Sequence, residues 1–180
     1  ATGEMRATMA LTEPGGGSDL TRMKTTATRQ GDHWLLNGQK TFITNAVSAD
    51  LFITVARTDP QSQGGNGFSV FVIEKGGAGF TTGKNFDKTG WCSADMSELF
   101  FDNFAVPAAN MLGEEGKGFY MLMQGLERER MSLCAQCIGM AERALTITLE
   151  HVKTRAAYGR TLWDLQAIRL TGASGHNLKD

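Results

Sequence analysis

Two polar segments of the chain combine residue types that could bind a flat, hydrogen-bonding ligand. The first, Met9–Asp19 (MALTEPGGGSD), places a threonine hydroxyl, backbone amides and a serine where a strand gives way to a turn. Such a polar edge suits a flat cofactor or a phosphate-bearing ligand. The second, Asn37–Asn45 (NGQKTFITN), carries Phe42 and Thr44 two positions apart and therefore on one face of a strand. An aromatic wall beside a hydroxyl could shield and hydrogen-bond one edge of an isoalloxazine ring; the alternative is an ordinary strand pair with exposed threonines.

The cysteines and histidines favour structural interpretations. Cys134 and Cys137 form a C-x-x-C whose two thiols would share one helix face. Core cysteines are favoured there over a redox pair or half of a zinc site, because no histidine spacing completes such a site. The three histidines are scattered along the chain. We therefore expect no metal site.

Two charged segments also have a plain and a functional interpretation. Gly113–Phe119 (GEEGKGF) precedes a helix and is favoured as a helix-start turn over a phosphate site, since it is not a Walker loop. Glu127–Arg130 (ERER) is typical of a solvated helix face. A buried catalytic acid or base in this segment is the alternative.

The elements that must position these residues are strands in the first two thirds of the chain. Residues 5–107 contain short runs rich in Thr, Val, Ile and Phe, separated by turn-forming clusters such as Asn37-Gly38 and Asp59–Gly67. This pattern predicts an antiparallel barrel or sandwich rather than alternating strand–helix units. The predicted strands are Met5–Thr12, Lys24–Gln30, His33–Asn37, Thr41–Thr44, Leu51–Thr58, Phe68–Glu74, Phe80–Asn85 and Glu98–Phe104.

From Gly118 the apolar residues recur at steps of three or four, which predicts one long helix to about Arg155. At 1.5 Å per residue its length is ~57 Å, so we expect its distal half to need packing partners from outside the chain. Tyr158-Gly159 ends it, and Leu162–Leu170 starts another helix. Thr171–Asp180 loses the periodicity.

Composition bounds the class of protein. Lysine and arginine number 18 against 19 acidic residues, a formal net charge of −1, which argues against an electrostatic nucleic-acid binder. No run of about 18 apolar residues is present, so we expect no membrane span. The 22 glycines predict many turns, and three cysteines are too few for a disulfide scaffold. Because the chain opens within a predicted strand, we expect it to be a fragment.

Taken together, these segments resemble the acyl-CoA dehydrogenase family, in order, over Gly3–Leu170. Ordered motifs of this kind are more specific than any single one. The family's T-E-P-G-x-G-S-D appears as Thr12–Asp19, its N-G-x-K-x-W-I-T as Asn37–Thr44 with Phe42 for Trp, its R-x-x-Y/F-G as Arg155–Gly159, and its L-Q-x-I as Leu165–Ile168. GEEGKGF and the long helix look most like the long-chain and isovaleryl branches.

The resemblance implies an α+β fragment. Residues 1–112 would form the middle β domain, and residues 113–180 the start of an incomplete C-terminal helical bundle. It also implies FAD as cofactor and a homotetramer. By that likeness Leu11 and Thr12 meet the flavin pyrimidine edge, Phe42, Ile43 and Thr44 line the ring, and Arg155 and Gln166 reach the FAD of a neighbouring subunit.

The implied reaction is α,β-dehydrogenation of an acyl-CoA thioester to a trans-2-enoyl-CoA, in fatty-acid or branched-chain oxidation. Ser18, Glu127 and Arg130 match positions that approach the acyl-CoA. Glu129 matches the catalytic base of the isovaleryl and long-chain branches; in most of the family the base lies further downstream than Asp180. We expect the 180 residues alone to be inactive.

The likeness further implies an electron-transfer flavoprotein as electron acceptor. The expected location is the cytoplasm of a bacterium or the mitochondrial matrix of a eukaryote. Two alternatives remain open: a flavin-dependent oxidase or monooxygenase of the same fold, and a non-catalytic scaffold relative.

Overall fold

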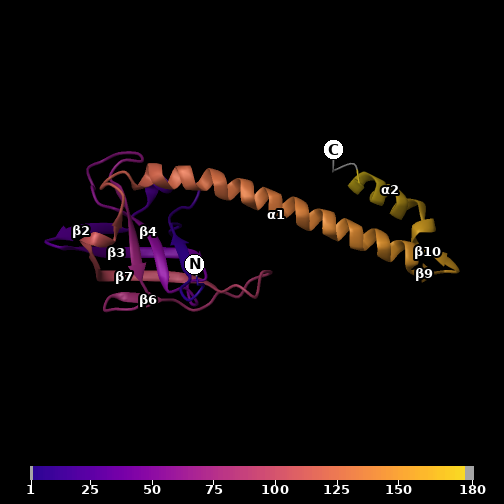
Figure 1. Cartoon of the computed structure of the whole chain (residues 1–180), viewed down its shortest axis with the longest axis horizontal. Helices are drawn as coiled ribbons and strands as arrows, with labels where there is room; N and C mark the ends of the chain where they lie inside the picture. The colour runs from indigo at the N-terminus through magenta and orange to yellow at the C-terminus, as the bar shows by residue number, and fades with distance from the viewer. Residues whose placement is uncertain (1, 177–180) are drawn as a thin grey trace. The chain divides into compact units, whose positions relative to one another are not determined.

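The computed structural model describes residues 2–176, with side chains as far as Gly172 (Figure 1). It divides into two compact units, residues 1–124 and 125–180, and each is described here by itself. The first unit holds the strands β1 (Ala7–Ala10), β2 (Thr26–Gln30), β3 (His33–Thr44), β4 (Leu51–Arg57), β5 (Phe68–Glu74), β6 (Phe80–Thr82), β7 (Met96–Pro107) and β8 (Met111–Leu112).

These strands form one sheet in the order β6-β7-β3-β2-β4-β5-β8, with β1 paired to β4. The α+β class and the mainly antiparallel sheet are confirmed. Two pairings depart from the expectation, because β1 runs parallel to β4 and Thr26 of β2 pairs in parallel with Arg57 of β4. Among the described residues the end strands β6 and β8 do not pair with each other, so the sheet is not a closed barrel.

The sheet folds over itself and encloses an aromatic core. Trp34 of β3 and Phe71 of β5 meet edge to face, with ring centroids 5.6 Å apart, although two other strands separate β3 from β5 in the sheet. Phe52 of β4 and Phe80 of β6 also come from separated strands, and their ring centroids lie 5.3 Å apart with the rings tilted. Because side chains of one pleated face pack against those of a distant strand, this part of the molecule is a sandwich.

Strand β3 is longer than the sequence predicted. Asn37-Gly38 was expected to be a turn between two strands, but it lies inside β3, at a shift in the β3–β7 register between Leu36 and Gly38. Asn37 holds this irregularity, since its side-chain oxygen accepts from the Asn103 amide at 2.8 Å. Asn37-Gly38 does mark a backbone irregularity, but it is a bulge within β3 and not a turn between two strands.

We expect Gly38→Ala to lower the free energy of unfolding by about 3 kcal/mol. Gly38 has φ +148, and a Cβ placed there would lie 2.5 to 2.8 Å from side-chain and backbone atoms of Thr25. Gly31→Ala is the control, because Gly31 also has positive φ (+62) but an added Cβ would meet nothing within 4 Å. Urea unfolding of both variants separates crowding from backbone strain, and equal losses would contradict the crowding argument.

Helix α1 (Gly118–Thr154) begins in the first unit and continues into the second, as its apolar period predicted. The second unit also contains β9 (Ala156–Ala157), β10 (Arg160–Thr161), a 3₁₀ turn at Leu162–Asp164 and α2 (Gln166–His176). Tyr158-Gly159 makes the tight turn between β9 and β10, with φ values of 53 and 76. Helix α2 runs to His176, so the expected loss of order from Thr171 is wrong as far as His176, and residues 177–180 lie outside the described residues.

The C-terminal part of α1 packs against α2. Trp163 lies under the Lys153 ammonium at 5.4 Å, and a mainly apolar groove of about 360 Å³ runs between Leu149 and Ile168. Further back along α1, Cys134 and Cys137 are exposed, and so are their neighbours Leu133 and Ile138. The core interpretation of these cysteines is therefore wrong for this chain, in which nothing described covers that stretch of the helix.

No helix within residues 2–176 combines the length and the apolarity that a membrane crossing requires.

Candidate functional site

The two polar segments singled out in the sequence lie side by side. We call residues 11–19 the lip. The backbone amide of Thr41 in β3 donates to the carbonyl of Thr12 at 2.8 Å, and the Lys40 ammonium donates to the carbonyl of Leu11 at 3.1 Å. Consecutive residues of β3 thus hold consecutive carbonyls of the lip. The structure therefore brings Leu11 and Thr12 to the strand that carries Phe42 and Thr44.

A second irregularity in β3 presents Phe42. The β3–β7 register shifts between Lys40 and Ile43, and Lys40 and Thr41 are both buried although they are consecutive. Phe42 follows with φ 57, a left-handed conformation that is costly for a bulky side chain, and is 62% exposed. Thr44 is also exposed, whereas Ile43 between them is buried in the core at 2% exposure. Phe42 and Thr44 are both exposed, as the strand alternation predicted, and the Ile43 side chain between them is buried.

A buried ion pair joins the lip to β3. Lys40 Nζ lies 2.8 Å from Glu13 Oε1, and the two side chains are 0% and 6% exposed. The same ammonium contacts Met23 Sδ at 3.6 Å, so its three N–H donors are all accounted for. The Glu13 carboxylate also accepts from the amides of Lys24 at 2.5 Å and Thr25 at 3.0 Å. One pair therefore ties together the lip, the start of β2 and the middle of β3.

The pair holds Glu13 in its charged form. Burial by itself raises the pKa of the Glu13 carboxyl, but the Lys40 ammonium and the Lys24 amide outweigh it and bring this pKa below its ordinary 4.5. Burial lowers the pKa of the Lys40 ammonium, and the Glu13 carboxylate partly offsets that effect. A buried carboxylate with an ammonium and two amides around it has the partners that its charge requires.

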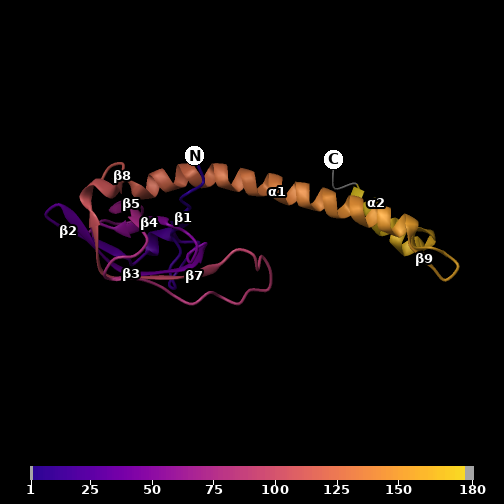
Figure 2. The same cartoon turned by 60° about the horizontal axis from the view of Figure 1, so that its bottom comes forward.

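The long connection that precedes β7 (Figure 2) contacts the residues that follow β3. Asp95 accepts from the backbone amide of Val47 at 2.7 Å, and its own carbonyl accepts from the amide of Asn45 at 2.8 Å. Phe86 of the same connection packs beside Phe42, with ring centroids 5.5 Å apart. The exposed ring of Phe42 is therefore supported on one side and free on the other.

The lip itself is a tight turn. The amides and carbonyls of Glu13 and Gly16 exchange two hydrogen bonds of 3.2 and 3.0 Å. Ser18 is exposed, and Asp19 caps the short 3₁₀ helix at Leu20–Arg22 by accepting from the Thr21 amide. Asp19 is thus a structural residue of the motif, whereas Ser18 is free to meet a ligand.

The remaining predicted site residues belong to the second unit. Glu127, Glu129 and Arg130 lie on exposed turns of α1; Glu127 and Arg130 share a face at a spacing of three, and Glu129 faces elsewhere. Arg155 follows the end of α1, and Gln166 is the first residue of α2. Both side chains are exposed. The predicted roles of these five residues stay predictions.

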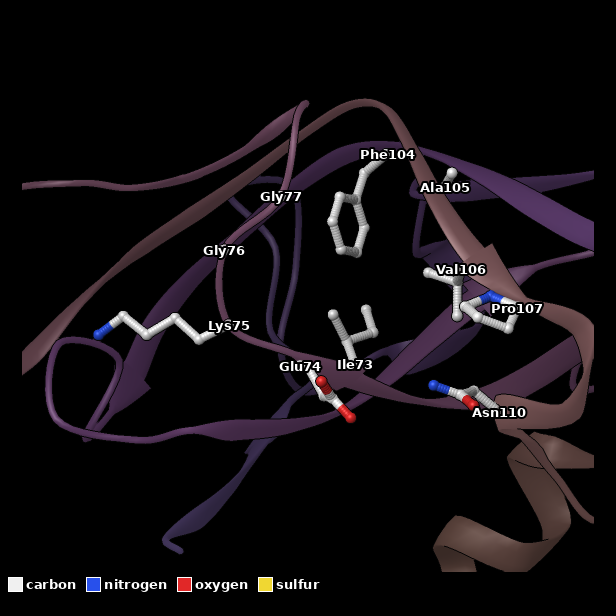
Figure 3. A pocket seen from close by; sticks show the side chains of 10 residues that line it. All are labelled: Ile73, Glu74, Lys75, Gly76, Gly77, Phe104, Ala105, Val106, Pro107 and Asn110. Atoms are coloured by element: carbon white, nitrogen blue, oxygen red, sulfur yellow. The ribbon is translucent and has the colours of Figure 1, made fainter.

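A hollow of about 410 Å³ lies elsewhere in the first unit, between the ends of β5 and β7. Figure 3 shows Ile73 and Phe104 facing each other across it, with Lys75 extending away. None of the predicted site residues lines this hollow. Among the described residues, no three His, Cys, Asp or Glu side chains are grouped so as to hold a metal ion.

The residues of the first unit fit a flat conjugated ring with polar edges. Phe42 offers an exposed aromatic face in a conformation that the strand alone would not adopt, and Thr44 offers a hydroxyl on the same face. Leu11 and Thr12 border that face as half-buried residues of the lip. Gly17 keeps space beside Thr12, because a Cβ there would lie 3.1 Å from Thr12 Cγ2.

Sequence reasoning missed the residues that hold this arrangement. Glu13 and Lys40 were included only as members of their sequence motifs, with no role assigned, and Asp95 was not considered. A signal for Lys40 exists, because a lysine beside β-branched and aromatic residues in a strand is unusual unless its charge is paired.

Comparison with known proteins agrees with the motifs. Residues 8–104 match the family model described as acyl-CoA dehydrogenase, middle domain, and residues 116–174 match acyl-CoA dehydrogenase, C-terminal domain. The mitochondrial long-chain specific acyl-CoA dehydrogenase of Rattus norvegicus is 43% identical over 162 residues, which are 89% of this chain and 38% of that protein.

Two solved structures are similar over nearly the whole chain. The acyl-CoA dehydrogenase from Geobacillus kaustophilus superposes with a TM-score of 0.94 at 43% identity, covering 98% of this chain and 47% of that one. The FAD complex of PigA has a TM-score of 0.91 at 35% identity, covering 98% and 46%. This chain spans about two fifths of the length of the curated relatives that it matches.

Proposed function

The chain belongs to the acyl-CoA dehydrogenase family, and we propose on this basis that the whole protein oxidises acyl-CoA thioesters to trans-2-enoyl-CoA with FAD. The observation that carries the proposal is the exposed face of Phe42 and Thr44 beside the lip. A strained, exposed aromatic residue costs stability and is retained where it serves a ligand. When bound there, FAD would supply the acceptor for the hydride that leaves the β-carbon.

The residues of the first unit bind and orient the cofactor. Phe42 would line the flavin ring, and the Thr44 hydroxyl would lie near N5. Leu11 and Thr12 meet the pyrimidine edge through backbone and hydroxyl groups. Ile43 contributes through its main chain, since its side chain is buried in the core.

The residues of α1 act on the substrate. Glu129 takes the α-proton as general base, and Glu127 and Arg130 approach the CoA moiety. In the first unit, Ser18 of the lip contacts the acyl-CoA. The preferred acyl chains are medium-to-long or branched, as in the long-chain and isovaleryl branches. The likeness to a long-chain specific relative supports this preference.

The whole protein is proposed to be a homotetramer of fatty-acid or branched-chain oxidation that passes electrons to an electron-transfer flavoprotein. Arg155 and Gln166 would reach the FAD of a neighbouring subunit, and the exposure of both side chains is compatible with that role. The domain boundary is placed between residues 112 and 113. The compartment follows the source: bacterial cytoplasm or mitochondrial matrix.

Anaerobic titration of the full-length protein tests this function. We expect visible flavin absorbance in the purified protein and its bleaching by a stoichiometric amount of a saturated acyl-CoA. The matching 2-enoyl-CoA is the control, because it has no hydride to give and should leave the flavin oxidised. Flavin that only another substrate class reduces would favour an oxidase or monooxygenase, and a protein without flavin would favour the scaffold alternative.

A further inference from the structure

The buried Lys40 side chain is the main polar anchor of the lip on β3. Apart from the 2.8 Å bond between the Thr41 amide and the Thr12 carbonyl, the described contacts between residues 11–13 and β3 all involve Lys40 Nζ. The ammonium reaches Leu11 through its carbonyl and Glu13 through its carboxylate. Lys40 holds the carbonyl of Leu11 and Thr41 holds the carbonyl of Thr12. Both lip residues that are proposed to contact the cofactor are therefore held directly by β3.

The same lysine is close in sequence to the other half of the site. Phe42 is two residues along β3, within the register shift between Lys40 and Ile43. The Lys40 side chain is thus anchored in the lip, and two residues later the exposed Phe42 ring lies on the proposed cofactor face. A change at Lys40 alters the spacing between the two halves without touching a residue that would contact the cofactor.

We propose that Lys40 and Glu13 are positioning residues that set the lip against β3 at the spacing the flavin requires. The inference rests on the proposed function. An apolar side chain at position 40 could fill the same buried volume, but it would leave the Leu11 carbonyl without its side-chain donor and the Glu13 carboxylate with only the Lys24 and Thr25 amides. On β3 the lip would then be held only by the Thr41–Thr12 bond, and the pyrimidine edge and the N5 edge could not be met together.

Lys40→Met in the full-length protein tests the proposal by two readouts. In the apoprotein, we expect deuterium uptake of the peptide that contains Thr41 to be at least about tenfold faster, because the lip detaches locally. In the holoprotein, we expect at least about tenfold weaker FAD binding and a shifted visible spectrum of the flavin that remains bound.

Two further variants separate positioning from stability. Ile73→Ala removes a core side chain of β5, a strand that carries no proposed site residue, and it serves as the control for a lowered unfolding midpoint. The double variant Glu13→Gln, Lys40→Met removes both charges and should recover much of the midpoint. It should not recover FAD affinity or the wild-type spectrum, because neither side chain then spans the lip and β3.

The outcomes are distinct. Weak FAD binding in Lys40→Met and in the double variant, with Ile73→Ala close to wild type, supports the proposal. FAD loss that follows the unfolding midpoint in all three variants overturns it, and so does unchanged FAD binding in Lys40→Met. If the wild type binds FAD but no acyl-CoA reduces it, the proposed function fails while the positioning role is still decided by the variants. If the wild type binds no FAD, both are wrong.

Discussion

Glu129→Gln slows flavin reduction by acyl-CoA about 10³-fold in the full-length protein while FAD and the acyl-CoA still bind. Gln keeps the size and polarity of the side chain but cannot take the α-proton, and a general base typically contributes 10²- to 10⁴-fold. Anaerobic stopped-flow measurement of the reduction rate at saturating acyl-CoA reports this step directly. The dissociation constant of the matching enoyl-CoA shows whether the substrate pocket is intact.

Glu127→Gln is the matched control for Glu129→Gln. It makes the same chemical change on the same exposed stretch of α1, two residues and about 200° around the helix. A residue that only approaches the CoA moiety should raise KM a few-fold and leave the saturated reduction rate nearly unchanged. Near-normal reduction by Glu129→Gln would instead move the base to a residue outside these 180.

Helix α1 and the exposed face of β3 could be predicted because their signals are local. Apolar residues at steps of three and four predicted α1 to within one residue at its end. Alternation predicted Phe42 and Thr44 on one face, and both are exposed on either side of the buried Ile43. The left-handed conformation of Phe42 could not be predicted from local sequence, since such a strained conformation persists only where surrounding contacts, such as that with the Phe86 ring, offset its cost.

The contacts that build the site were hidden because they join residues far apart in the chain. Lys40 and Glu13 are 27 residues apart, and Asp95 holds Val47 across 48 residues. Composition assigns such charged residues to the surface, where most of them lie. Asn37-Gly38 misled for a related reason, because the same dipeptide serves a turn or a bulge and only the partner Asn103 decides.

Glu13→Gln lowers the free energy of unfolding by about 3 to 5 kcal/mol at neutral pH, because it leaves the ammonium of Lys40 buried without a countercharge. The amides of Lys24 and Thr25 donate to different oxygens of Glu13, so the single Gln oxygen can serve only one of them in place, and the mismatched donor adds to the electrostatic loss. Urea unfolding of the full-length protein measures it. Asp50→Asn is the control, since the exposed Asp50 carboxylate accepts from the Arg6 amide and its loss should cost less than about 1 kcal/mol.

The pH dependence of this loss has a definite sign. The pKa of Glu13 in the folded chain lies below the ordinary 4.5, so its ionised form contributes stability that is complete above about pH 4.5. That contribution is lost as the pH falls through the folded pKa. The stability difference between wild type and Glu13→Gln should therefore shrink on acidification, whereas a difference that is constant from pH 7 to pH 3 would contradict an ionised Glu13.

Combining Glu13→Gln with Lys40→Met shows why this pair is costly to break and yet adds little stability. Removing one partner exposes the full desolvation penalty of the other, whereas removing both leaves no buried charge to stabilise. The double variant should consequently be more stable than either single variant, and a thermodynamic cycle should give a coupling energy larger than the loss in Glu13→Gln alone, that is, more than about 3 kcal/mol. Additive losses in the cycle would mean that the two side chains act independently. A pair that apolar packing could replace without loss of stability has to be explained by what it holds in place, namely the lip against β3.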